Sequence, residues 1–274
     1  MNLIDLGTGP PVLLIPGIQG RWEWMKPTVQ ALAARCRVLT FSLADEPTAG
    51  ADLEAIGFDA YVAQVRQALD QARLERAVIC GMSYGGLIAA AFAARHPERV
   101  SGLVLASALP PSWQLNERAR FYLRAPRLLA PLFCLASLRL YPEIASASRG
   151  RWAGAMAAAR MGARAIRYPF HPTHMARRAR LATEIDDSTL DGLRVPVLVV
   201  TGEDALDMVV PPRLTMEYVR RWPHARHAVL ARTGHLGALT RAAEFAGLVT
   251  SFAQQVADDE ERASQHPSQR RHVG

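Results

Sequence analysis

Cysteine, lysine and long apolar runs are all scarce in this sequence of 274 residues. The three cysteines, Cys36, Cys80 and Cys134, are too few and too scattered for a disulfide scaffold or a thiolate zinc cluster, which favours a reducing compartment. The apolar run Val12 to Ile15 is too short for a membrane span, and Met1 to Pro10 has no basic segment typical of a signal peptide. We therefore expect a soluble, cytoplasmic protein.

Because lysine is nearly absent, arginine carries the positive charge. Lys26 is the only lysine among 32 basic residues, which exceed the 25 acidic residues by a formal charge of +7. Thirteen arginines and one acid, Glu143, lie between Arg118 and Arg180, so the rest of the chain is net negative. The sequence has no nucleic-acid-binding motif and no set of aromatic residues for stacking on bases. We expect no nucleic-acid partner, and a membrane-surface role for the basic segment is a minor interpretation.

The pattern of apolar residues predicts the fold class. Half of the residues are hydrophobic and 21% are charged, which suits a buried core and excludes disordered and fibrous classes. Short apolar runs bounded by turn residues predict strands at 12–15, 38–41, 77–80, 100–106, 195–201 and 227–231. Helical periodicity or alanine-rich composition predicts helices at 62–72, 84–96, 212–222 and 242–256. This alternation predicts an α/β fold with a mostly parallel sheet flanked by helices.

Strand signals vanish between residues 109 and 190, where short helical patches rich in alanine, leucine and arginine are separated by prolines. We interpret this segment as a helical cap inserted into the α/β core, whose two parts are residues 1–108 and 191–257. Residues 258–274 contain almost nothing to bury, so we expect them to form a disordered tail.

A glycine-flanked serine follows the strand predicted at 77–80. The segment Gly81-Met82-Ser83-Tyr84-Gly85 turns from that strand into an alanine-rich helix. The glycines let strand and helix approach closely, while the serine occupies a strained backbone position that exposes its hydroxyl at the edge of the sheet. This nucleophile elbow predicts Ser83 as a catalytic nucleophile; the alternative is an ordinary glycine-rich turn.

From about Val12 to Val256, the chain resembles the α/β-hydrolase fold superfamily, in the serine-nucleophile branch with a helical cap. Leu14 to Gly20 matches, in position and pattern, the family loop that completes an oxyanion hole. The resemblance implies that the backbone amides of Ile18 and Tyr84 are the oxyanion donors. Pro16 stands where the family usually has a histidine, so this loop must be held in a different way.

A serine nucleophile needs a histidine base and a carboxylate that orients the histidine. The family order is serine, acid, histidine, and His235 lies between the last predicted strand and the last predicted helix. The acid should follow the strand at 195–201. Asp207 has the family spacing to Val210 and Pro211 and is preferred, while Asp204 in the same segment is the alternative.

Two residues beside the oxyanion loop are predicted to contact substrate. Gln19 offers a side-chain donor, although a loop glutamine that faces solvent is an equal alternative. Trp22, or its neighbour Trp24, is expected to line the pocket, unless both rings pack into the adjoining helix. Aliphatic and aromatic residues alternate with arginines in the cap, which predicts an apolar acyl pocket with a positive entrance, although a solvated helix face is an equal alternative.

These observations together predict a serine hydrolase that cleaves an ester or similar acyl bond through an acyl-enzyme intermediate. Neither a metal nor an organic cofactor is expected. A serine at the elbow argues against the dehalogenase and epoxide-hydrolase branches, whose nucleophile is an aspartate, and leaves C–C hydrolases, lactonases and haloperoxidase-like enzymes open. A non-catalytic ligand-binding protein on the same fold is the alternative from another class. The expected partner is a small ester-like molecule, and one form of this expectation is an apolar molecule with an anionic group. The sequence leaves the oligomeric state open.

Overall fold

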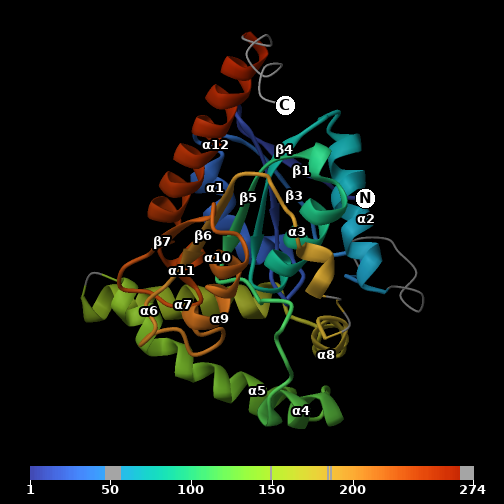
Figure 1. Ribbon diagram of the computed structural model, residues 1–274. Coiled ribbons are helices and arrows are strands. Elements are labelled where there is room, and N and C mark those ends of the chain that lie inside the picture. Colours follow the sequence, from blue (N-terminus) through green and yellow to red (C-terminus); the bar gives the residue numbers. More distant parts are fainter. Residues whose placement is uncertain (47–56, 149, 184, 186, 266–274) are drawn as a thin grey trace.

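The computed structural model describes residues 1–46, 57–148, 150–183, 185 and 187–265. Within them, seven strands form one sheet in the order β1-β3-β2-β4-β5-β6-β7 (Figure 1). β1 (Ile4–Leu6) runs antiparallel to β3 (Arg37–Thr40), and every other neighbouring pair is parallel. The other strands are β2 (Pro11–Ile15), β4 (Ala77–Met82), β5 (Val100–Ala106), β6 (Val197–Thr201) and β7 (Arg226–Val229).

Helices cover both faces of the sheet. Side chains alternate along β2, so that Val12 and Leu14 pack on one side, and Leu13 and Ile15 on the other. The first side is covered by α1 (Lys26–Leu32) and α12 (Ala242–Gln265), and the second by α2 (Phe58–Gln71) and α3 (Tyr84–Arg95) (Figure 1). The resulting α/β fold with its mostly parallel sheet confirms the predicted fold class.

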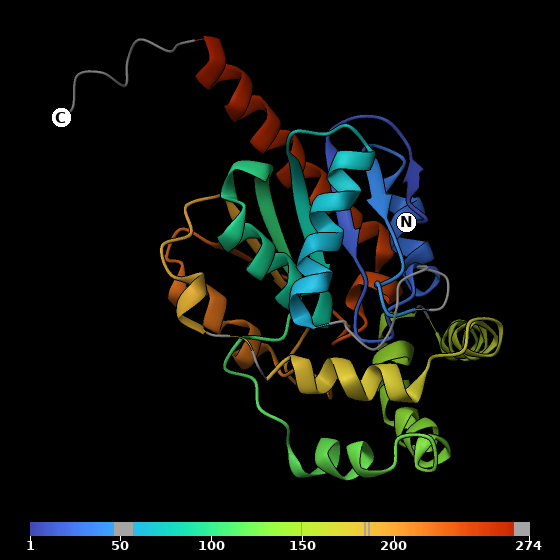
Figure 2. The ribbon, with the colours of Figure 1, turned by 90° about the vertical axis from the view of Figure 1, so that its right-hand side faces the viewer.

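A group of helices between β5 and β6, hereafter the helical insertion (residues 109–190), lies at one end of the sheet (Figure 2). Its helices are α4 (Glu117–Arg124), α5 (Ala130–Ala136), η3 (Ser137–Leu140), α6 (Tyr141–Ala147), α7 (Arg151–Arg167), α8 (Pro172–Leu181) and η4 (Asp187–Leu190). The remaining short helices are η1 (Trp22–Met25), η2 (Pro97–Arg99), α9 (Pro212–Thr215), α10 (Glu217–Arg221) and α11 (Gly237–Thr240). No helix among the described residues is long and apolar enough to cross a membrane.

Several elements differ from the sequence-based expectation. β1 is only three residues long, too short to give a periodic signal. The helix expected at 212–222 is divided at Met216 into α9 and α10. α12 continues to Gln265, into the segment expected to be disordered, where Glu260 pairs with Arg76 and Arg262 pairs with Asp259. Ion pairs between charged side chains therefore stabilise the end of this helix, where few apolar residues remain to be buried. Residues 266–274 lie outside the described part.

Candidate active site

Ser83 lies at the turn between β4 and α3 with the strained backbone that the elbow predicts. Its φ is 54° and its ψ is −118°, an arrangement that residues with a Cβ rarely adopt. A Cβ added to Gly81 would lie 2.2 Å from the carbonyl oxygen of Gly85. Only glycine at position 81 lets the strand and helix backbones pack this closely, and the turn thereby fixes the Ser83 hydroxyl.

The loop after β2 packs directly against this turn. A Cβ added to Gly85 would lie 2.5 Å from the carbonyl oxygens of Ile15 and Pro16. One added to Gly17 would lie 3.6 Å from the Ser83 Cβ. The loop that leads to Ile18 therefore packs beside the serine turn. The role of the Ile18 and Tyr84 amides as oxyanion donors stays a prediction.

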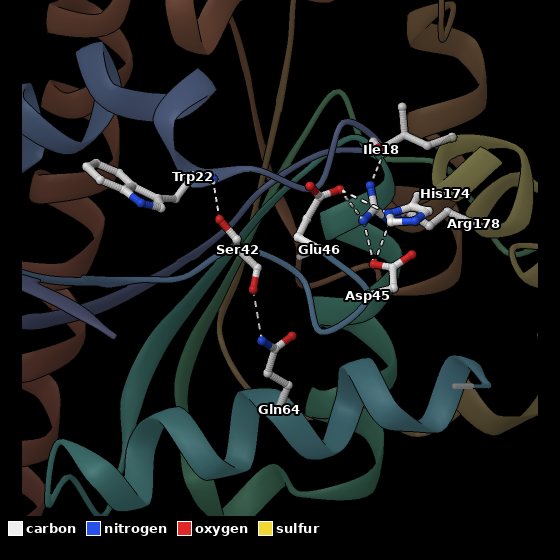
Figure 3. A network of polar contacts seen from close by, with 8 residues as sticks. All are labelled: Ile18, Trp22, Ser42, Asp45, Glu46, Gln64, His174 and Arg178. Atoms are coloured by element: carbon white, nitrogen blue, oxygen red, sulfur yellow. Dashed lines mark hydrogen bonds and ion pairs between the residues drawn. The ribbon is translucent and has the colours of Figure 1, made fainter. Parts of the chain in front are cut away.

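The two residues predicted to contact substrate lie further along the same loop. The Gln19 amide oxygen would be 3.4 Å from a Cβ at Gly17, which puts this side chain next to the serine turn. Trp22 begins η1, and its backbone N–H donates to the Ser42 hydroxyl over 3.5 Å. Figure 3 shows its half-buried indole on the side away from Arg178. Substrate binding by Gln19 and Trp22 stays a prediction.

His235 joins Ser83 to a buried carboxylate. Its Nε2 atom lies 3.0 Å from the Ser83 Oγ, within hydrogen-bond distance. Its Nδ1 atom lies 3.5 Å from the Asp207 Oδ2, within ion-pair distance. Ser83, His235 and Asp207 are 6%, 7% and 4% exposed, so the three groups interact in a largely desolvated setting.

Asp207, rather than Asp204, faces the histidine. The Asp207 Oδ1 accepts the backbone N–H groups of Val209 and Val210 at 2.9 Å and 2.8 Å, which leaves Oδ2 directed at His235. Asp204 is exposed in the preceding turn. A Cβ added to Gly234 would lie 2.6 Å from the Asp207 nitrogen, so the acid loop and the histidine loop pack backbone to backbone.

Glu143, on α6 of the helical insertion, has a buried carboxylate and was not among the predicted site residues. Its Oε1 accepts the N–H of Gly234 at 2.8 Å, the N–H of Leu236 and the Thr233 hydroxyl at 3.1 Å. Burial raises the pKa of Glu143, while these donors and the nearby His235 act in the opposite direction. Glu143 is the one acid among thirteen arginines between Arg118 and Arg180, where a surface ion pair is the ordinary expectation, so the sequence contained no signal of its burial.

A second unpredicted feature is the buried cluster of Arg178, Asp45 and Glu46. Arg178 is 0% exposed, and its guanidinium contacts both carboxylates and the carbonyl oxygen of Ile18 (Figure 3). The arginine belongs to α8 and the two acids follow β3, more than 130 residues earlier. Charged residues this far apart look like ordinary surface residues in a sequence.

The combined geometry is suited to nucleophilic catalysis. A serine hydroxyl in contact with an imidazole can transfer its proton as the oxygen attacks an electrophilic carbon. A buried carboxylate beside the other ring nitrogen fixes the tautomer and stabilises the imidazolium. Backbone N–H groups at the adjoining turn and loop are the usual source of oxyanion stabilisation.

Comparison with known proteins agrees with the fold. The profile of the alpha/beta hydrolase fold family matches residues 10–242. A 2-hydroxymuconate semialdehyde hydrolase of Pseudomonas sp. (strain CF600) is 29% identical over 92% of this chain and 89% of its own length. A pimeloyl-[acyl-carrier protein] methyl ester esterase of Vibrio atlanticus is 24% identical, over 90% of this chain and 96% of its own.

A solved structure supports the same fold. A thermophilic esterase from Thermogutta terrifontis superimposes with a TM-score of 0.72 at 22% identity, covering 93% of each chain. The family profile extends over most of the sequence, including the serine turn, the acid segment and His235. The chain therefore belongs to the α/β-hydrolase fold family.

Proposed function

We propose that this hydrolase cleaves an ester or a similar acyl bond by a serine mechanism, with Ser83 as nucleophile, His235 as base and Asp207 as the orienting acid. The observation that carries the proposal is the 3.0 Å contact between the His235 Nε2 and the strained, elbow-held Ser83 Oγ. The Asp207 carboxylate on the opposite ring nitrogen completes the set.

The mechanism has two steps. Nε2 of His235 takes the Ser83 proton while Oγ attacks the acyl carbon, and the resulting oxyanion accepts hydrogen bonds from the Ile18 and Tyr84 amides. The imidazolium then donates its proton to the leaving oxygen, which departs and leaves an acyl-enzyme. In the second step the imidazole takes a proton from a water molecule, whose oxygen attacks the acyl carbon. The bond between the acyl carbon and Oγ then breaks, the imidazolium returns a proton to Ser83, and the acid is released.

The substrate is proposed to be a small molecule whose acyl chain lies under the helical insertion, which acts as a cap. Arginines of that segment would favour a substrate with a carboxylate or phosphate at its outer end. The esterase activity named for the Vibrio relative supports ester chemistry. The scarcity of cysteine leads us to propose a cytoplasmic location.

C–C bond hydrolysis by the same three residues is the second candidate. It is favoured by the 29% identity to a 2-hydroxymuconate semialdehyde hydrolase over 92% of this chain. Such a reaction also needs a base, an orienting acid and oxyanion stabilisation, so the described residues suit both reactions. Two assays separate these reactions. One monitors hydrolysis of 2-hydroxymuconate semialdehyde through the loss of its absorbance, and the other measures hydrolysis of simple esters.

The test combines p-nitrophenyl esters of increasing acyl length with covalent labelling by a fluorophosphonate. Wild-type protein should hydrolyse the esters and take up the label, and Ser83→Ala should do neither while keeping the wild-type unfolding temperature. Ser112→Ala, an exposed serine outside the site, is the matched control and should behave as wild type. Retained labelling of Ser83→Ala would reject the nucleophile, and a wild type without turnover or label would favour a non-catalytic binding protein.

A further inference from the structure

Two charged side chains of the helical insertion are buried against the loops that hold the proposed catalytic groups. Arg178 is 0% exposed and Glu143 is 1% exposed. Charged groups are almost never buried to this extent without specific partners, because desolvation disfavours the charge. What these two side chains hold is therefore informative about their role.

Arg178 ties the oxyanion loop to the segment after β3. Its Nη1 donates to the Ile18 carbonyl oxygen over 2.8 Å, while Nε donates to Asp45 over 3.0 Å and Nη2 donates to Asp45 and, over 2.7 Å, to Glu46 (Figure 3). His174, one turn earlier on α8, lies 3.8 Å from the same Glu46 carboxylate. The loop carbonyl is thus held by a guanidinium that is itself fixed by two carboxylates.

This contact bears on the direction of the Ile18 N–H. The Gly20 N–H donates to the Gly17 carbonyl over 2.9 Å, and a trans peptide directs the Ile18 N–H opposite to that carbonyl. Arg178 fixes the next carbonyl, so both peptides that flank Ile18 are constrained. Gly20 has a φ of +79°, and a Cβ there would lie 2.2 Å from Nη1, so the loop is closed tightly on the guanidinium.

Glu143 holds the histidine loop in a similar way. Its Oε1 accepts the N–H of Gly234 and the N–H of Leu236, the residues on either side of His235. The Thr233 hydroxyl donates to the same oxygen. One carboxylate oxygen therefore fixes the backbone on both sides of the proposed base, on which the 3.0 Å contact to Ser83 depends.

We propose that Arg178 and Glu143 are positioning residues: Arg178 sets the oxyanion loop and Glu143 sets the His235 loop. The helical insertion then belongs to the catalytic framework, in addition to any role in covering substrate. This inference rests on the proposed function. It also explains how the loop is held when Pro16 occupies a position that cannot donate a side-chain hydrogen bond.

The Arg178 test uses two variants, since loss of this cation alone leaves two buried carboxylates unpaired. Arg178→Lys keeps the charge but lacks the planar fork that spans three acceptors. The triple variant Arg178→Met/Asp45→Asn/Glu46→Gln removes all three charges together and also the hydrogen bond to Ile18. Arg180→Met is the control, because Arg180 lies on the same helix but is exposed, and its guanidinium donates to the Leu123 carbonyl oxygen.

Folded Arg178 variants should lose roughly tenfold to a hundredfold in kcat, less than the loss of an entire oxyanion donor, with KM changed by less than about threefold. The affinity for phenylboronic acid, whose serine adduct carries a tetrahedral anion, should fall by a similar factor. If Arg178 had only a structural role, its variants would have a lower unfolding temperature, but kcat and boronate affinity would not fall by similar factors. Wild-type kcat and boronate affinity in either folded variant would overturn the role of Arg178, and if Arg178→Lys does not fold, the triple variant decides.

The Glu143 test compares Glu143→Leu, which removes the acceptor, with Glu143→Gln, which keeps an acceptor oxygen in place. Glu143→Leu should lower kcat and the rate of fluorophosphonate labelling in parallel, and Glu143→Gln should recover most of both. Glu117→Gln, at an exposed position of α4, is the matched control. Equal activity of Glu143→Leu and wild type would overturn the proposal, as would equal losses in the Leu and Gln variants.

The wild type separates this inference from the proposed function. If wild-type protein neither turns over ester nor labels at Ser83, both proposals fail. If the wild type labels at Ser83 and the folded Arg178 and Glu143 variants match its kcat, only the positioning roles fail.

Discussion

The sheet core and the helical insertion differ in the kind of contact that stabilises each of them. Core residues such as Leu39 and Val104 are 0% exposed within two apolar clusters, one on each face of the sheet. In the insertion, α4 and α5 bury no side chain, and Leu128, Trp152 and Ile166 are 80%, 86% and 85% exposed. The two ends of the insertion join an apolar cluster of the sheet through Leu109, Leu181, Ala182 and Leu190, whereas α4 and α5 add nothing to it. Buried polar contacts of Arg178 and Glu143 supplement this apolar attachment.

The difference has a structural lesson. Apolar packing stabilises in proportion to area and has little directionality, whereas hydrogen bonds and ion pairs fix both distance and angle. Arg178 and Glu143 make such directional contacts with the two loops whose geometry matters most for the proposed reaction. Stability therefore comes mainly from the sheet, while precise placement of the loops depends on the insertion.

The largest expected effect concerns the acid, which belongs to the core. Asp207→Asn should lower kcat by about 10⁴-fold with little change in KM, because an amide favours the wrong histidine tautomer. Asp204→Asn, at an exposed turn in the same loop, should retain near wild-type kcat. Steady-state ester hydrolysis measures both. The acid assignment is wrong if the two variants exchange these results.

The second effect tests the unequal stability of the two regions. Leu39→Ala in β3 should lower the free energy of unfolding by about 2–5 kcal/mol, because it leaves a cavity in the apolar cluster. Leu135→Ala in α5, where the side chain is 63% exposed, should change it by less than about 0.5 kcal/mol. Urea unfolding followed by circular dichroism gives both values. Similar losses for the two variants would contradict the comparison.

A smaller effect is expected from the arginines of the insertion. For esters that carry a carboxylate or phosphate, kcat/KM should fall as salt is added, since ions screen the attraction between exposed charges. Neutral esters of the same acyl length are the control and should respond little. The measurement is kcat/KM at increasing sodium chloride concentration. An equal response of both substrates would remove the electrostatic contribution of the insertion.

The smallest expected effect is a pH dependence of stability at Glu143. Burial raises the pKa of Glu143 in the folded protein, so the native state binds its proton more tightly than the unfolded chain does. This contribution to stability is present below the unfolded pKa and is lost as the pH rises through the folded pKa. Free energies of unfolding across acidic pH should differ in slope between wild type and Glu143→Gln. Parallel slopes would exclude the contribution.

The sequence predicts best those features that are encoded locally. The elbow at Ser83 depends on glycines two residues away, and the position of His235 depends on the strand before it and the helix after it. The sequence left the acid open between Asp204 and Asp207, because the choice depends on which carboxylate the Val209 and Val210 amides fix. Burial and side-chain pairing, which only the folded chain defines, supply that information.

Long-range polar pairing was outside the reach of the sequence. Arg178 meets acids that lie 132 and 133 positions earlier, and Glu143 meets Gly234 across 91 positions. In an arginine-rich segment, each of these charges resembles a solvated surface residue. The sequence also left the position of the Trp22 ring undetermined. A large aromatic ring can pack into a core or line a pocket, and the neighbouring residues in the sequence do not distinguish the two.

The cluster of Arg178, Asp45 and Glu46 also limits how this sequence can change during evolution. Removing one partner of a buried ion pair costs about 3–5 kcal/mol, a large part of the stability of a typical domain. The three positions are therefore expected to change together. In a library of random variants selected for activity, a chain that has lost Arg178 should carry a second replacement at Asp45 or Glu46, and sequencing the survivors reads out this coupling directly.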